Sequence, residues 1–172
     1  RIVAYYEAEV YVFYKRSAEE LDAIVSVNTP VGLYNTICGM LASLETRLVA
    51  TLGAASIDEQ AVLDYVEEAY FADPMACVEK PEATVSVYTG SGYQRIVELS
   101  VSYGAAAGAL EYRREALGET AARLLAGAVS ENTAYRALQC ANALVSRCRS
   151  DEGAPDTLWS AIMAGEASSE GM

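Results

Sequence analysis

The chain has 172 residues and a formal net charge of −12, from 24 acidic and 12 basic side chains. An apolar fraction of 52% is typical of a globular chain rather than a disordered one, and the length predicts a single domain over residues 1–172. Histidine is absent, which excludes catalytic triads, general bases and zinc or iron sites that depend on an imidazole.

The negative charge and the cysteine content limit the partners and the compartment. An acidic surface repels nucleic acids and anionic membranes, so we expect neither as a partner. The longest uncharged run, residues 23–44, is interrupted by Asn28 and Pro30 and is not expected to span a membrane. The four cysteines lack metal-ligand spacing, and no secretion signal is expected. Free thiols favour a reducing compartment, so we expect the cytoplasm or an assembled particle.

The N-terminal segment, residues 2–14, is rich in aromatic and β-branched side chains. Its alternation predicts a strand, and a helical stripe through the same segment remains the alternative. Ser17 and Glu20 then form a capping box, which predicts a helix over residues 18–27.

Residues 30–52 carry a helical pattern that begins at Thr29-Pro30 and has Gly53 at its expected C-terminal end. An apolar stripe and a stripe of small residues give this helix two faces, one for the core and one for a neighbour. A further helix is predicted over residues 57–72, capped by Ser56 and ending before Pro74.

Residues 83–103 give the clearest strand signal. Two alternating runs flank Gly90-Ser91-Gly92, and Val97, Leu99 and Val101 share a face. This pattern predicts a β-hairpin, with residues 2–14 as the expected third strand.

The rest of the chain is predicted to be helical. Helices are expected over residues 105–125 and 131–149, the second with an apolar face that includes Tyr135, Leu138 and Val145. Asp156 caps a last short helix, and residues 165–172 form a polar tail. The expected fold class is α+β, with five to six helices and a small antiparallel sheet.

Two local features of the sequence are candidates for chemistry. Glycine-flanked amides at residues 90–92 can cradle phosphate, but a phosphate loop opens a helix, and here the glycines join two strands. Cys77 lies near Lys80 and is the best candidate nucleophile, although no histidine is available as its base. No catalytic residue or cofactor is therefore assigned, and we lean towards a protein without enzymatic activity.

Paired carboxylates give an alternative interpretation. Glu19 and Asp22 share one predicted helix face, and Asp64 and Glu67 share another. Two such faces could hold Mg²⁺, which prefers oxygen ligands. The pairs resemble in style the sites of all-helical, Mg²⁺-dependent nucleotide pyrophosphohydrolases, whose full acidic motif is not matched here.

Tyrosine is unusually common, with 12 residues against two phenylalanines. Its large apolar area and polar tip are favoured at interfaces. The predicted interface residues are Tyr5, Tyr6, Tyr11, Tyr14, Tyr88, Tyr93 and Tyr103.

Contacts with proteins are therefore the expected function. The first hypothesis is a non-enzymatic structural or assembly subunit, a homo-oligomer or a component of a larger particle such as a virus or phage. The alternatives are an acidic inhibitor or decoy that binds a basic partner, and a Mg²⁺-dependent hydrolase that uses the paired carboxylates.

Overall fold

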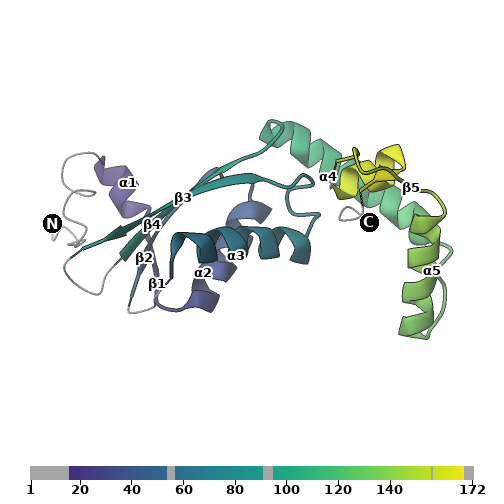
Figure 1. Cartoon of the computed structure of the whole chain (residues 1–172), viewed down its shortest axis with the longest axis horizontal. Helices are drawn as coiled ribbons and strands as arrows, with labels where there is room; N and C mark the ends of the chain where they lie inside the picture. Colours follow the sequence, from purple (N-terminus) through teal and green to yellow (C-terminus); the bar gives the residue numbers. More distant parts are fainter. Residues whose placement is uncertain (1–15, 54–56, 91–94, 156, 169–172) are drawn as a thin grey trace. The chain divides into compact units, whose positions relative to one another are not determined.

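The computed structural model describes residues 16–53, 57–90, 95–155 and 157–168 (Figure 1). The chain divides into two compact units, Arg1–Ala72 with Pro81–Ser102 and Asp73–Lys80 with Tyr103–Met172. Helices and a small sheet are both present, so the predicted α+β class is confirmed. The expected strand at residues 2–14 lies outside the described residues, and the single domain stays a prediction.

A four-stranded mixed sheet forms the centre of the first unit. Its strands are β1 (Val25–Val27), β2 (Arg47–Leu52), β3 (Glu82–Thr89) and β4 (Arg95–Ser102), in the spatial order β1-β2-β4-β3. The antiparallel pairing of β3 with β4 confirms the hairpin. The other edge of β4 pairs with β2, which the sequence pattern predicts as part of a helix. Because β1 runs parallel to β2, the sheet is mixed and not antiparallel throughout.

Two helices pack on one face of this sheet (Figure 1). α2 (Pro30–Ala42) begins at Thr29, whose hydroxyl accepts a hydrogen bond from the Gly32 amide at 3.0 Å, as predicted. α3 (Glu59–Ala72) ends before Pro74, also as predicted. The apolar stripes of the helices face alternate strand residues, so both become buried. The buried residues are Leu33, Ile37, Met40, Leu41, Val62, Val66, Ala69 and Tyr70 on the helices, and Leu48, Ala50, Leu52, Val97, Leu99 and Val101 on the strands.

A short helix, α1 (Ala18–Asp22), contacts the opposite face of the sheet. The predicted capping box is present, because Ser17 and Glu20 each accept a hydrogen bond from the backbone amide of the other. Leu21 follows and packs against Ile96, as Val49 also does. Since Ile96 and Val49 alternate with the inward-facing strand residues, this small cluster lies on the sheet face away from α2 and α3.

Three predicted helices are shorter than the sequence indicates. The helix expected over residues 131–149 ends at Val145, and Arg149–Ser150 forms a short strand. The helix expected over residues 18–27 ends at Asp22 and is followed by β1. The helix expected over residues 30–52 ends at Ala42 and is followed by β2. Residues 47–52 fit a strand better because β4 supplies hydrogen bonds along their whole length, and Gly53 ends a strand and not a helix.

The early end of α2 is a Schellman motif without glycine. Leu44 adopts the left-handed conformation with φ 55°, its amide donates to Leu41 O, and the Glu45 amide donates to Met40 O. The left-handed region costs a leucine roughly 1–2 kcal/mol. Leu44 is buried, and its apolar burial offsets that cost.

The second unit is mainly helical. It contains α4 (Ala107–Leu125), α5 (Thr133–Val145), a single π-helical turn η1 (Ser160–Ala164), and the paired strands β5 (Arg149–Ser150) and β6 (Glu166–Ala167). Its buried core is small and includes Leu110 and Leu117 of α4. The Arg113 guanidinium pairs with Glu79 and lies 5.5 Å from the centre of the Trp159 ring, which ties α4 to two other segments.

The C-terminal segment differs from the predicted polar tail. Residues 166–167 form β6 beside β5, and Ala167 and Ser168 are buried. Gly165 makes this turn possible, because its φ of 72° is strained for other residues and its amide donates to Ser160 O. The predicted cap Asp156 lies outside the described residues. Within the described ranges, no helix is long and apolar enough to cross a membrane.

Candidate interaction surface

The apolar side of α5 is exposed. Tyr135, Leu138 and Val145 have 55%, 54% and 66% of their surface open to solvent, and none of the helix's 13 residues is buried. An amphipathic helix in a folded domain usually buries this side against its own core. Here the predicted face is present, but nothing in the described part of the second unit covers it.

The start of α5 is well defined. Asn132 is its N-cap, and the Asn132 side-chain oxygen accepts hydrogen bonds from the Ala134 and Tyr135 amides at 3.0 and 3.2 Å. The helix ends with the Ser146 amide bonded to Asn142 O. Backbone groups at both ends of α5 therefore have hydrogen-bond partners, and the helix presents its apolar side as a regular surface.

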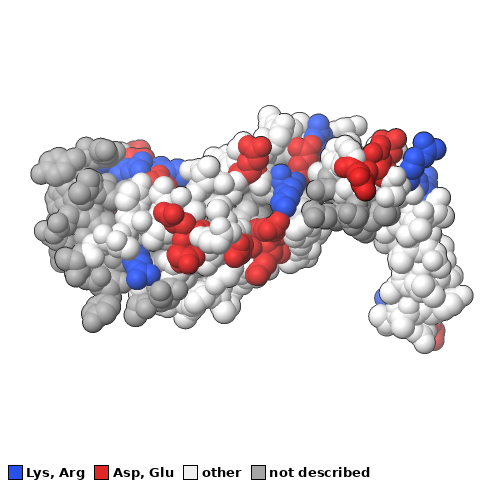
Figure 2. Space-filling model, in the orientation of Figure 1, with Lys and Arg blue, Asp and Glu red and all other residues white. Residues whose placement is uncertain are grey.

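The surface of α5 is also almost free of charge. Arg136 is the only charged residue between Thr133 and Val145, and most of the surface around α5 in Figure 2 is drawn white. The half-buried residues Cys140, Ala143 and Leu144 lie on a different side of the helix from Leu138. α5 also contacts α4. A large apolar surface without charge is a feature of protein interaction sites.

Exposed apolar side chains concentrate in the second unit. Among the described residues, seven of the ten exposed large hydrophobic side chains belong to it, although the two units have almost equal numbers of described residues. These seven are Tyr112, Leu125, Val129, Tyr135, Leu138, Val145 and Met163. The second unit therefore leaves more of its apolar surface unburied, and α5 carries the most regular part.

The predicted tyrosine cluster is only partly described. Tyr5, Tyr6, Tyr11, Tyr14 and Tyr93 lie outside the described residues. Tyr88 is on β3 and half-buried, where it packs against Ile96, and its hydroxyl lies 3.5 Å from the Glu98 carboxylate. Tyr103 follows the end of β4 and is half-buried. Tyr88 thus contributes to packing within the sheet, and the tyrosine interface stays a prediction.

A closed ring of four charges lies on the α1 face of the sheet. Arg16 and Arg47 each contact both Glu20 and Glu98, at 3.5 and 3.0 Å for Arg16 and at 3.1 and 2.7 Å for Arg47. The ring joins α1 to β2 and β4. The ring is not among the features predicted from the sequence. The signal that could have revealed it is Glu98, the one carboxylate in β4, which interrupts the apolar run of that strand.

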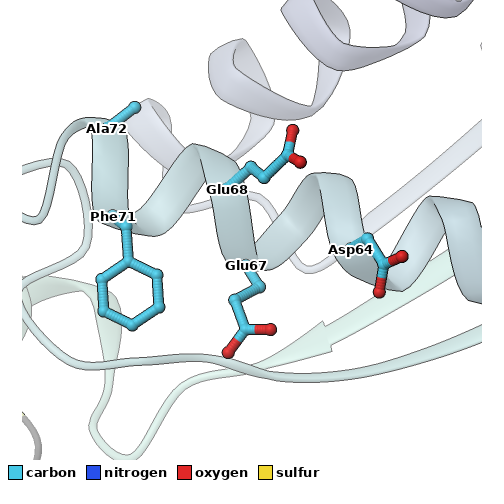
Figure 3. Close-up of a pocket in the computed structure, with 5 residues that line it drawn as sticks. All are labelled: Asp64, Glu67, Glu68, Phe71 and Ala72. Atoms are coloured by element: carbon cyan, nitrogen blue, oxygen red, sulfur yellow. The ribbon is translucent and has the colours of Figure 1, made fainter. Parts of the chain in front are cut away.

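The carboxylates proposed as metal ligands do not all come together. Asp64 and Glu67 are on α3 and line a shallow pocket with Glu68, Phe71 and Ala72 (Figure 3). Asp64 accepts a hydrogen bond from Gln60 at 2.7 Å. Glu19 and Asp22 are on α1, which contacts the other face of the sheet.

Metal binding therefore gains no support from this arrangement. Among the residues that the structure describes, no three carboxylates or thiols are grouped so that they could hold a metal ion.

Cys77 does not have the environment of a nucleophile. It is fully buried, its thiol donates to Glu79 O at 3.4 Å, and burial raises its pKa to about 11. A thiol with this pKa is protonated near pH 7 and reacts slowly. Lys80 lines a pocket with Thr157 and Trp159 that does not include Cys77.

Comparison of the chain with protein-family models, with curated proteins and with solved structures finds no match. The function is therefore inferred from the chain's own geometry, in which the exposed face of α5 is the most distinct surface.

Proposed function

We propose that the chain is a non-enzymatic assembly subunit that binds other protein chains, copies of itself included, through the exposed apolar face of α5. The observation that carries this proposal is the exposure of Tyr135, Leu138 and Val145 on one well-capped helix. Burying these side chains against another chain removes apolar surface from water, at about 25 cal/mol per Å². A face of this kind is unfavourable on a protein that stays monomeric.

The experiment is a sedimentation velocity series on the full chain. The monomer mass is 18.4 kDa, and the proposal expects the average mass to rise above this value as the protein concentration increases. A chain that stays monomeric at the highest concentrations, and forms no complex with any candidate partner, overturns the proposal.

A second candidate function, that of an acidic inhibitor or decoy that binds a basic partner, is supported by the negative net charge of the chain. The net charge is −12, and Asp64, Glu67 and Glu68 line the pocket on α3 together with the apolar Phe71. This combination suits a partner with basic side chains on an apolar surface. Figure 2 shows acidic groups at several places on the visible face of the molecule.

The test of the second candidate is the binding of a cationic peptide. Replacing Asp64, Glu67 and Glu68 with their amides is expected to weaken binding, more so at low salt. The matched control neutralises Glu111, Glu115 and Glu119 on α4, which removes the same number of charges. Equal loss in both variants shows an unspecific charge effect and contradicts the candidate.

A further inference from the structure

The exposed face of α5 has the spacing of a coiled-coil seam. Ala134, Leu138, Ala141 and Val145 follow one another at intervals of four, three and four residues, and all four are exposed. This is the a/d spacing with which one helix packs against another. Tyr135 flanks the seam and widens its apolar surface.

The order of large and small residues in the seam is self-complementary. In an antiparallel pair of α5 helices, Leu138 of each copy meets Ala141 of the other, and Val145 meets Ala134. Each large side chain then packs against a small one, which allows close packing without a void or a clash. In a parallel pair, identical residues meet, and alanine faces alanine at two levels.

The charges at the two ends of α5 favour the same direction. Glu131 precedes the helix, and Arg147 follows it. The antiparallel register brings Glu131 of each copy level with residues 147–148 of the other, so opposite charges approach at both ends. The helix dipoles are also opposed in this arrangement, which is favourable.

We infer that α5 is the contact between two copies of this chain, paired antiparallel about a two-fold axis. The inference rests on the proposed function and names its partner and geometry. An isologous contact of this kind closes as a dimer. A helix of 13 residues is about 20 Å long, which is short compared with a standard interface. The dimer is therefore weak and forms in a concentration-dependent manner.

The first test compares two variants by sedimentation velocity at low salt. Leu138→Glu puts a charge in the middle of the seam and is expected to weaken dimerisation at least tenfold. The control Arg136→Gln changes the net charge by the same amount on another side of α5 and is expected to leave it unchanged. Circular dichroism checks that both variants remain helical.

The second test uses exposed end residues, whose substitution does not disturb the fold. Glu131→Arg and Arg147→Glu are each expected to weaken the dimer about three- to tenfold, because each change replaces two attractive pairs with repulsive ones. The double variant restores the attraction with reversed signs and is expected to recover the affinity. A parallel pair gives no such recovery.

The outcomes separate the inference from the proposed function. An oligomer that Leu138→Glu leaves intact overturns α5 as the contact, here and in the proposed function, but not the role of the chain as an assembly subunit. A dimer weakened by Leu138→Glu but not recovered by the charge swap overturns the antiparallel register. A chain that never associates overturns both.

Discussion

Arg47 of β2 and Glu98 of β4 are diagonal neighbours across the strand pair, with Arg47 Nη2 2.7 Å and Arg47 Nε 3.0 Å from Glu98 Oε1. The Glu98 side chain is 16% exposed. Arg16 holds the second carboxylate oxygen at 3.0 Å. Glu98 is therefore the centre of the charge ring that fastens α1 to the sheet, and its removal leaves two guanidinium groups close together.

Glu98→Ala is expected to lower the free energy of unfolding by about 1–3 kcal/mol, measured by urea denaturation. A fully buried ion pair that loses one partner costs about 3–5 kcal/mol, and the exposure of Arg47 reduces that value. The control Glu82→Ala, at the exposed start of β3, is expected to change stability by less than about 0.5 kcal/mol. Equal effects of the two substitutions contradict the role of the ring.

Because of Glu20, we expect the free energy of unfolding to depend on pH in the acid range. The Ser17 backbone amide, followed by the Arg47 side chain, lowers the pKa of Glu20 below its ordinary value of 4.5. A carboxyl with a lowered pKa contributes stability that is present above pH 4.5 and is lost as the pH falls through the folded-state pKa. Stability curves for the wild type and Glu20→Gln should therefore converge in acid, and curves that stay parallel contradict this assignment.

Because of Cys77, we expect the free energy of unfolding to depend on pH in the alkaline range. Because burial raises its pKa to about 11, the stability that it contributes is present below its ordinary value of 9.0 and is lost as the pH rises towards 11. The same burial is expected to make Cys77 the slowest thiol to react with iodoacetamide. Mass spectrometry of the labelled peptides gives the order, with half-buried Cys38, Cys140 and Cys148 as internal references. Rapid labelling of Cys77 in the folded protein contradicts the prediction.

Asn132→Ala is expected to destabilise α5 by about 1 kcal/mol, because two backbone amides lose their acceptor. Hydrogen exchange at the first turn of the helix measures the effect. Asn132→Asp keeps an oxygen in place and serves as the control. Since an ordered α5 is needed for the contact between copies, Asn132→Ala should also weaken association, and an unchanged affinity argues against the α5 dimer.

The elements predicted correctly are those with strong local signals. The hairpin follows from alternation on both sides of a glycine turn, and the capping box at Ser17 and the N-cap at Thr29 are set by hydrogen bonds within a few residues. α3 ends where Pro74 removes a backbone donor. Each of these features depends on neighbours in the chain, so sequence reasoning identifies them.

The elements that the sequence analysis predicted wrongly depend on contacts with residues far away in the chain. Leu48 fits both a helical stripe that continues α2 and an alternating strand with Ala50 and Leu52. Pairing with β4 decides in favour of the strand, and that partner lies about fifty residues away. The end of α2 was equally hard to predict, because the left-handed residue is a buried leucine and not the usual glycine.

The sequence by itself determined the fold class, the hairpin, the presence of the helices α3, α4 and α5, and the apolar side of α5, because each depends on periodicity and local hydrogen bonds. Only the tertiary structure decided that β2 is a strand, that Glu98 is held by Arg16 and Arg47, and that the apolar side of α5 is exposed. A periodic sequence pattern predicts which side of a helix is apolar. Whether that side is buried depends on what packs against the helix. That difference makes α5 the candidate contact with a second chain.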